Sequence, residues 1–408
     1  MDDRELPLFS AFGIEVEYMI VRDGDLNVAP LADRVLDAAG ADGDTEVEVG
    51  DLAWSNELAL HVIELKTNGP SATLDGLGRT FADHVARVER LLAPHGARLM
   101  PTAMHPWMDP AADTALWPHA DADIYRAFDR IFGCRGHGWV NLQSIHVNLP
   151  FRGDREFAAL HAACRVALPI LPALAASSPI CDGRVQPTLD TRMVVYRDNA
   201  ARVPSVTGAV VPEPVYSRAE YEGDLLARIY RDLAPLDPAG VLRHEWVNAR
   251  GCIARFDRST IEIRVLDTQE CAQADLAVAG ATIETVRALV EERWAPAAAQ
   301  KPWHHARLAE LLDACVRDGD RAVVRDRDYL DLFAFPERSA RAGELWQYLV
   351  EEAVSRAAAY PEWRRTLDIV WDRGCLARRI RDAVQAGGAL RDVYARLCDC
   401  LRNDIAFV

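Results

Sequence analysis

The sequence has no apolar run approaching the roughly 18 residues that a membrane-spanning helix needs. Positive charge is also in deficit, because 46 Lys and Arg residues against 62 Asp and Glu residues give a formal net charge of −16. Proteins hold duplex nucleic acid largely by neutralising its phosphates, so we expect no nucleic-acid partner. The start, Met1–Glu5, is acidic and lacks the apolar stretch of a secretory signal. We therefore expect a cytoplasmic protein without a membrane partner.

Several common sequence signatures are missing as well. The nine cysteines include no Cys-x-x-Cys pair, which argues against a zinc ribbon or a thioredoxin-like redox pair. Neither a GxxxxGK[ST] loop nor a GxGxxG fingerprint occurs, so any nucleotide must be held by an open sheet rather than by a helix N-terminus. No Ser-His-Asp or Cys-His nucleophile can be defended. His137 lies between two glycines, where we expect an ordinary turn.

What is present reads as a globular chain long enough for one large domain or two ordinary ones. Alternating apolar residues predict strands at 11–22, 45–50, 55–67, 140–149 and 259–267. Helices are expected at 30–39, 73–94, 121–132 and 154–176, the last divided by Pro169 and Pro172, and long loops at 179–216. Further helices are expected around 276–290 and at 303–317, 339–358, 361–384 and 388–403. We predict an α+β fold with a largely antiparallel sheet, comprising a catalytic core at 1–275 and a helical part at 276–408 packed on the same unit.

Carboxylates embedded in apolar strand sequence are the most informative feature. Glu15 and Glu17 are two residues apart, so strand geometry places both on one face. The same spacing puts Glu262 beside Arg264, and His146 on one face with Ser144 and Asn148. A solvated outer face would also give alternating polar residues. Three strands that each offer Glu, His or Arg favour a polar interior face instead.

Glu57 and Glu64 are seven residues apart, which is an odd number. A regular strand would therefore point them to opposite faces. They can join one site only if a bulge or bend lies between them, near residues 61–63. The alternative is that one of them is a surface residue.

Inward-facing glutamates repel one another, so a positive group should lie among them. Oxygen-rich sets without thiolates suit Mg²⁺, with Mn²⁺ as the alternative, far better than zinc. Magnesium commonly works with phosphate, and arginine forks bind phosphate oxygens. Four arginines lie near the last strand: Arg250, Arg255, Arg258 and Arg264. The residues alone thus indicate ATP–magnesium chemistry and leave the acceptor open.

Seven segments in the same order resemble the glutamate–cysteine ligase family in its second, carboxylate–amine ligase branch, over about residues 10 to 290. They are 13–18 (GIEVEY), Glu57 with 64–67 (ELKT), 104–107 (MHPW), 146–148 (HVN), 174–179 (LAASSP), Thr207-Gly208 with Pro212, Ser217, Glu220 and Tyr221, and 248–250 (NAR) leading into 260–264 (TIEIR). The resemblance implies a sheet curved into a funnel, as in the glutamine synthetase catalytic domain. It also implies that a substrate carboxylate attacks the γ-phosphate of ATP and that an amine then attacks the acyl phosphate.

The resemblance further implies roles for individual residues. The metal-site positions are Glu15, Glu17, Glu57, Glu64, His146 and Glu262. Arg264 matches the arginine that faces the transferred phosphoryl group and Arg250 the family arginine just upstream, while Arg192, with Arg255 and Arg258, is a candidate for the nucleotide.

The implied partners are small, amino-acid-like substrates, with glutamate and cysteine as the first pair. Asn148 stands where close relatives often carry a second histidine, and residues 183–192 lack the usual Thr-Gly pair, in the region that selects substrates. A phosphotransferase on the same sheet and an inactive relative acting as a binding partner are the alternatives. Amine-dependent phosphate release separates the ligase from the phosphotransferase.

Overall fold

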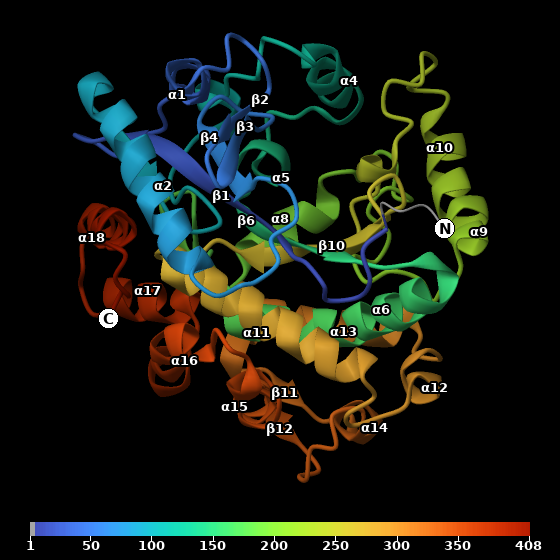
Figure 1. The fold of residues 1–408 in the computed structure, drawn as a ribbon. Helices are drawn as coiled ribbons and strands as arrows, with labels where there is room; N and C mark the ends of the chain where they lie inside the picture. Colours follow the sequence, from blue (N-terminus) through green and yellow to red (C-terminus); the bar gives the residue numbers. More distant parts are fainter. Residues whose placement is uncertain (1–4) are drawn as a thin grey trace.

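The computed structural model describes residues 5–408 and is built around an eight-stranded sheet (Figure 1). Seven strands follow the order β2-β3-β4-β1-β6-β10-β9, β5 pairs with β1, and every pair in this sheet is antiparallel. The strands are β1 (Gly13–Arg22), β2 (Glu46–Val49), β3 (Leu52–Asn56), β4 (Val62–Thr67), β5 (Ala97–Met100), β6 (Ser144–Pro150), β9 (Cys252–Arg255) and β10 (Thr260–Asp267). The predicted antiparallel α+β fold is confirmed, with β1 near the middle of the sheet.

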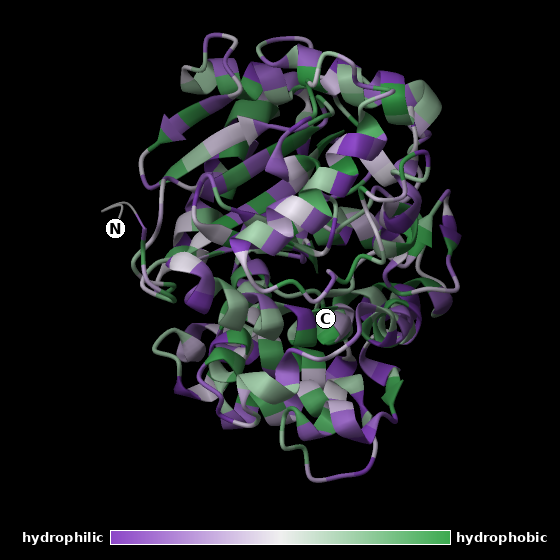
Figure 2. Ribbon diagram, turned by 90° about the vertical axis from the view of Figure 1, so that its right-hand side faces the viewer, coloured by the Kyte–Doolittle hydropathy of each residue, from purple (hydrophilic) through white to green (hydrophobic). Residues whose placement is uncertain are grey.

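The two faces of this sheet differ in polarity because side chains alternate along each strand. On β1, Ile14, Val16, Tyr18 and Ile20 are fully buried and belong to the main hydrophobic core. Because side chains alternate, Glu15 and Glu17 point to the opposite face, where they line the cavities described below. Purple and green alternate along the strands in Figure 2. The sheet therefore has one apolar face and one polar face.

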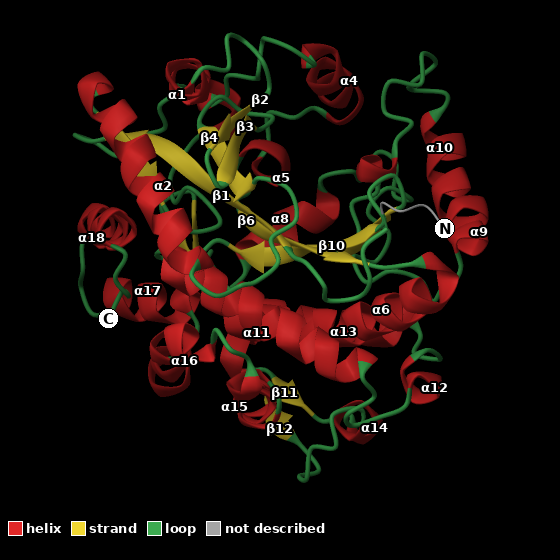
Figure 3. Ribbon diagram, viewed as in Figure 1, coloured by secondary structure: helices red, strands yellow, loops and turns green. Residues whose placement is uncertain are grey.

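The apolar face packs on three long helices, α2 (Leu77–Leu92), α6 (Gly153–Ala167) and α11 (Ala272–Val290). Helix α11 contacts both α2 and α6 and runs across beneath the sheet in Figure 3. The Tyr18 hydroxyl donates a hydrogen bond of 2.6 Å to Asp275 Oδ2 on this helix. Burial raises the pKa of Asp275 well above its usual range, and its other oxygen accepts the Gln269 N–H at 2.6 Å. This buried polar contact fixes the central strand on the central helix.

The chain beyond α11 is mostly helical and lies on the far side of α11 from the sheet, or beside α2 (Figure 1). It comprises α12 (Ala297–Gln300), α13 (His305–Asp318), α14 (Arg327–Asp331), α15 (Ala342–Glu352), α16 (Tyr360–Arg373), α17 (Leu376–Gln385) and α18 (Leu390–Asn403). A two-stranded sheet, β11 (Val323–Val324) with β12 (Ala340–Arg341), interrupts them. Helix α16 packs on α11 and α18 packs on α2 and β5, so this part shares the hydrophobic core of the sheet.

The polar face is rimmed by shorter elements. They are α1 (Ala32–Ala39), α3 (Pro110–Asp113), α4 (Ala122–Phe132), α5 (His137–Val140), α8 (Thr191–Asp198), α9 (Arg218–Glu220) and α10 (Ala227–Leu233). In Figure 1, α4, α5 and α8 lie on the side of the sheet away from α11. They leave a hollow above the polar strands in which the candidate site lies.

One segment of the described chain, Gly153–Ala175, is long and apolar enough by composition to cross a membrane. Of its most apolar window, 94% is buried inside the fold. It consists of α6, a 3-10 turn at Leu168–Ile170 and α7 (Leu171–Ala175), so the prolines divide it as predicted. Its apolar character is explained by its place in the core.

Several sequence expectations need correction. The strand expected at 55–67 is two strands, β3 and β4, joined by a turn, because the chain reverses after Asn56. The region 179–216, expected as loops, contains α8 and a small hairpin of β7 (Ile180–Cys181) and β8 (Arg184–Val185). The helix expected at 361–384 is interrupted at Gly374, whose φ of +88° ends α16. The short strands β5 and β9 were not predicted.

Replacing Tyr18 by phenylalanine tests the contact between strand and helix. We expect Tyr18→Phe to lower the apparent free energy of unfolding by about 1–3 kcal/mol, because it leaves a buried carboxyl oxygen without its donor. Urea denaturation measures this loss. The matched control is Tyr348→Phe, whose hydroxyl bonds the Ala334 carbonyl at an exposed position. An equal loss in the two variants would contradict the importance of the buried contact.

Candidate active site

The polar face of the sheet gathers carboxylates from β1, β4 and β10 and an imidazole from β6, which lies between β1 and β10. The register pairs Glu17 with Glu64 across β1 and β4, and Glu15 with His146 across β1 and β6. Glu262 on β10 pairs with Asn148 on β6. Residues that are directly opposite in a sheet share a face, so these side chains form one acidic floor.

A first group of possible ligands consists of Glu15, Glu64 and His146, with one atom from each within 4.8 Å of the others. His146 Nδ1 lies 3.0 Å from Glu15 Oε2, and Asn148 Nδ2 donates to the other Glu15 oxygen at 3.0 Å. Ser55 Oγ donates to Glu64 Oε1 at 2.7 Å, and Lys66 Nζ lies 3.3 Å from the same oxygen. Each carboxylate is thus fixed by a neighbouring strand.

A second group consists of Glu17, Glu57 and Glu64, also within 4.8 Å. Glu17 is held by the backbone N–H of Ser144 at 2.7 Å. Glu57 lies in the turn between β3 and β4, whereas Glu64 lies on the returning strand. The chain reversal between β3 and β4 provides a bend between them, one of the two conditions under which the sequence allowed both to reach one face. Glu64 belongs to both groups and so joins them.

Glu262 stands apart from the two groups because arginines hold it. Arg264 Nε donates to Glu262 Oε1 at 3.0 Å, and Arg255 Nη1 lies 3.5 Å from Oε2. The β10–β6 register shifts between Ile263 and Leu266, which places a bulge at 264–265. A bulge re-aims the side chains beside it. In this way Arg264 reaches over the floor of the site.

The crowding of carboxylates changes their pKa values. Burial, assisted by the charge of Glu15, raises the pKa of Glu64 to about 7. Burial and the charges of Glu17 and Glu64 raise the pKa of Glu57 well above its usual range. Burial also raises the pKa of Glu17. These three groups favour a proton or a cation beside them.

His146 and Glu262 respond in the opposite sense, because each has oppositely charged neighbours. Burial by itself lowers the pKa of His146, but the hydrogen bond to Glu15 and the charges of Glu17 and Glu262 raise it to about 9. Burial raises the pKa of Glu262, but Arg264, His146 and Arg255 outweigh it and lower that pKa to about 2. The imidazolium and the arginines thus offset part of the negative charge of the acidic floor.

The other predicted arginines are placed differently. Arg192 is buried at the edge of the hollow, where Nε donates to Asp267 at 2.7 Å and Nη2 to the carbonyls of Leu266 and Arg264. Arg250 is fully buried and pairs with Glu213 at 2.6 Å, so the structure does not bring its guanidinium to the lining of the hollow. Arg258 is exposed, lines the hollow and makes no ion pair within residues 5–408.

The hollow above the floor consists of three adjoining cavities. The central one, of about 420 Å³, includes both ligand groups except Glu17, together with Arg255, Arg258, Glu262 and Arg264. A cavity of about 410 Å³ adjoins it at Glu15 and Lys66 and is bordered by Phe12 and Pro150. A cavity of about 280 Å³ adjoins it at Glu57, His146 and Arg264. Ligands in the three cavities would therefore meet over the acidic floor.

The donor set fits a hard divalent cation. Oxygen atoms from four carboxylates and one imidazole nitrogen lie within the two groups, and no thiol joins them. Carboxylate oxygens suit Mg²⁺ or Mn²⁺, which prefer hard ligands. Because Glu64 belongs to both groups, it could bridge two such ions.

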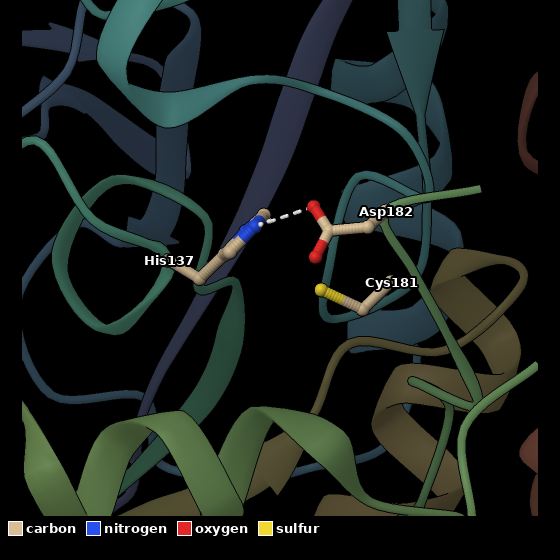
Figure 4. A group of neighbouring side chains, drawn as sticks. All are labelled: His137, Cys181 and Asp182. Carbon is tan, nitrogen blue, oxygen red and sulfur yellow. Dashed lines mark hydrogen bonds and ion pairs between the residues drawn. The ribbon is translucent and has the colours of Figure 1, made fainter. Parts of the chain in front are cut away.

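A second cluster, His137, Cys181 and Asp182, also brings potential ligands within 4.8 Å (Figure 4). Asn141 Nδ2 lies 2.9 Å from His137 Nδ1, and its amide is oriented because Oδ1 accepts the His105 N–H at 2.6 Å. Nδ1 therefore accepts, and Nε2 carries the hydrogen that it donates to Asp182 at 3.1 Å. Burial raises the pKa of Cys181 to about 11. Both the nitrogen facing Asp182 and the sulfur thus carry hydrogen, and the cluster is a hydrogen-bonded junction.

Sequence reasoning missed several residues that line the hollow. Ser55 pairs with Glu64 across β3 and β4, which only the register reveals. Tyr125 and Phe128 come from α4, Trp139 from α5, Tyr196 from α8 and Trp246 from the 3-10 turn Glu245–Val247. No periodicity links these five aromatic residues, so the sequence offers no signal for them.

Comparison with known proteins gives consistent relationships. The profile of Glutamate-cysteine ligase family 2 (GCS2) matches residues 11–396. An uncharacterized protein of Archaeoglobus fulgidus is 39% identical over 280 residues, 69% of this chain and 75% of that protein. A putative glutamate–cysteine ligase 2-3 of Rubrobacter xylanophilus is 30% identical over 185 residues, 45% of this chain and 46% of that one.

Among solved structures, glutamate–cysteine ligase of Francisella tularensis in complex with AMP is similar, with a TM-score of 0.62. The alignment covers 98% of this chain and 90% of that one at 14% identity. At this identity the similarity establishes a common fold.

The pKa values predict how pH would change the effect of a divalent cation held on the acidic floor. Glu64 and His146 have pKa values of about 7 and 9, above their ordinary 4.5 and 6.5, so the folded protein binds extra protons at each group between those limits. The stability of the metal-free protein should therefore fall as pH rises through this range. Magnesium competes with those protons. We expect excess MgCl₂ to raise the melting temperature more at about pH 8 than at about pH 6.

Differential scanning fluorimetry in calcium-free MgCl₂ measures the melting temperature at each pH. NaCl at the same ionic strength is the control. A magnesium shift that is the same at the two pH values, or that NaCl reproduces, would contradict a cation site on the acidic floor.

Proposed function

The chain belongs to glutamate–cysteine ligase family 2, and we propose that it is an ATP-dependent carboxylate–amine ligase that forms an amide bond through an acyl phosphate. The observation that carries this proposal is the acidic floor with arginines at its edge, in a hollow wide enough for three ligands. A nucleotide is supported by the AMP in the Francisella enzyme of the same fold. The proposed catalytic core is residues 1–275, with 276–408 packed on it, in the cytoplasm.

We assign magnesium, or manganese, to Glu15, Glu64 and His146 and to Glu17, Glu57 and Glu64. Glu262 is the sixth residue of this proposed site, adjoining it through Arg264. When bound, the ions would neutralise the triphosphate and polarise its γ-phosphoryl group. Arg258, exposed and free of ion pairs within the described chain, is suited to a phosphate oxygen, and Arg255 lies beside it. Arg192 donates a hydrogen bond to the Arg264 carbonyl and so helps to fix the backbone that carries Arg264.

The reaction has two displacements. A carboxylate oxygen of the donor substrate attacks the γ-phosphorus, the bond from phosphorus to the bridging oxygen breaks, and ADP leaves. The amine nitrogen of the second substrate then attacks the acyl carbon, the carbon–oxygen bond to phosphate breaks, and the nitrogen loses a proton. The protein contributes positioning and charge, without a covalent nucleophile.

Arg264 is the proposed catalytic residue for the phosphoryl group. Its side chain leaves the bulge of β10 and is oriented by Glu262 on one side and by the Asn248 carbonyl, 3.4 Å from Nη1, on the other. Burial by itself lowers the pKa of Arg264, but the Glu262 carboxylate raises it, so the guanidinium stays charged. A fixed cation can stabilise charge that develops during transfer without reorganising.

Arg250, the other arginine implied by the family resemblance, acts in this proposal as a positioning residue. Its Nη1 donates to Asn248 Oδ1 at 3.0 Å and to the Ser205 carbonyl at 3.1 Å, and Glu213 neutralises it. Arg250 thereby holds Asn248, whose carbonyl holds Arg264. The effect of Arg250 on the reaction is therefore indirect.

The direct test is phosphate release from ATP·Mg²⁺ with pools of carboxylates and amines, beginning with glutamate plus cysteine. A ligase requires both substrates and gives a product lighter than their sum by one water. Phosphate release without an amine and without condensation would instead identify the phosphotransferase. No turnover with any pool would contradict the proposal in favour of a binding partner.

We expect Glu15→Gln and Glu262→Gln each to lower kcat by about 100-fold or more, because each removes a fixed charge at the reacting phosphate. Glu262→Gln also removes the partner of Arg255 and Arg264, so its melting temperature should fall, while both variants should remain folded at the assay temperature. Glu310→Gln is the matched control, since Glu310 on α13 is exposed and makes no ion pair within residues 5–408. Steady-state kinetics on the pair that supports turnover measures this. Normal activity in both site variants would refute the metal assignment.

A further inference from the structure

The cavity of about 280 Å³ brings five aromatic rings together beside the charged floor, among aliphatic and charged residues. Phe128 lies at the centre of the group, with ring centroids 5.2 Å from Trp139 and 5.8 Å from Trp246. Tyr125 and Tyr196 complete the aromatic pocket, as these five rings are called below. A cavity of about 150 Å³ already accommodates benzene, so this one has room for a ring and a short chain.

Hydrogen bonds fix two of these rings, and a third ring lines two cavities at once. Tyr125 Oη accepts a hydrogen bond from Asn56 at 2.9 Å, and Trp139 Nε1 donates to the Asn199 carbonyl at 2.9 Å. Trp246 is half-buried and lines both this cavity and the central one. A ligand at the floor would therefore touch the Trp246 ring as it extends into the pocket.

Charge distinguishes this pocket from the central cavity. Its two arginines are already paired, Arg192 with Asp267 and Arg264 with Glu262. Arg258, which has no ion-pair partner among residues 5–408, lines the other two cavities but not this one. A ligand carboxylate would thus find no free cation in the aromatic pocket, whereas the phosphates and the donor carboxylate would find Arg258 in the central cavity.

An amine finds suitable partners in the aromatic pocket. Ring faces attract ammonium groups through their negative quadrupole. The Tyr196 hydroxyl is buried, with 8% of the residue exposed, and its oxygen lies close enough to the Arg264 guanidinium to accept a hydrogen bond from it, which leaves one lone pair. That lone pair can accept an N–H from an amine, and the carboxylates of Glu17 and Glu57 line the same cavity.

We propose that the aromatic pocket binds the amine substrate of the ligase and selects an amine that carries an aromatic ring or a bulky apolar group, in preference to cysteine. This deepens the proposed function and rests on it for the identity of the reaction. The ring lies against Phe128 and Trp246, and the amine nitrogen points back to the floor. There it meets the acyl carbon beside Arg264. Cysteine is too small to fill the pocket.

Binding to the full chain in MgCl₂ tests the pocket without requiring turnover. The probes are phenethylamine, ethylamine, which lacks the ring, and 3-phenylpropionate, which replaces the amine by a carboxylate. We expect phenethylamine to bind about tenfold or more tightly than either of the others, because only it supplies both a ring and an ammonium. Ligand-observed NMR titration gives the three Kd values.

Variants locate the binding. Trp246→Ala should weaken phenethylamine binding about tenfold, whereas Trp246→Phe should retain most of it because a ring remains. Trp371→Ala is the matched control, since Trp371 is also a half-buried tryptophan but lies on α16. Equal binding of ethylamine and phenethylamine, stronger binding of 3-phenylpropionate, or an unchanged Kd in Trp246→Ala would each overturn the proposal.

The phosphate-release assay separates this inference from the proposed function. A chain that binds phenethylamine through Trp246 but releases no phosphate with any donor would contradict the ligase and support an amine-binding pocket. The opposite outcome has two parts: kcat/KM is higher for cysteine than for every ring-bearing amine, and Trp246→Ala ligates cysteine as well as the unmodified chain does. That result would support the ligase and overturn the pocket.

Discussion

Repulsion among carboxylates is the interaction around which this structure is organised. Glu15, Glu17, Glu57 and Glu64 meet on one sheet face, where they are buried or half-buried, and like charges in such a place cannot all ionise without compensation. His146 and the arginines beside Glu262 supply part of that compensation from neighbouring strands. The remaining excess of negative charge is what a divalent cation would neutralise. The site is thus held in a state that favours ligands rich in positive charge.

Such a floor requires a rigid support, and the apolar face of the same strands provides it. Alternation along β1 puts Glu15 and Glu17 on one side and Ile14, Val16 and Tyr18 in the core on the other. Helix α11, with α2 and α6, packs against that apolar face. A strand buried on this side cannot move away when its carboxylates repel one another. The favourable free energy of packing in the core therefore offsets the repulsion among the carboxylates of the site.

Much of this arrangement is predictable from the sequence, because a period of two fixes the face of each side chain. That rule predicts that Glu15 and Glu17 share a face and that Glu262 and Arg264 do so too. It also predicts the strands of the antiparallel α+β fold. The relation of Glu57 to Glu64 does not follow from that rule, because it depends on a chain reversal within a segment that reads as one strand. The bulge at 264–265 and the pairing of Arg250 with Glu213 are long-range features with no local signal. The aromatic pocket escapes prediction for the same reason, as its rings come from four separate segments.

We propose that a substrate carboxylate attacks ATP over the acidic floor. Oxygen isotope transfer tests it most directly. A donor whose carboxylate is labelled with oxygen-18 is supplied with ATP, magnesium and an amine, and the phosphate released is examined by mass spectrometry. If an acyl phosphate forms, we expect one labelled oxygen to move from the carboxylate into phosphate for each amide bond formed. Amide formation that leaves the phosphate unlabelled would contradict an acyl phosphate and require another route.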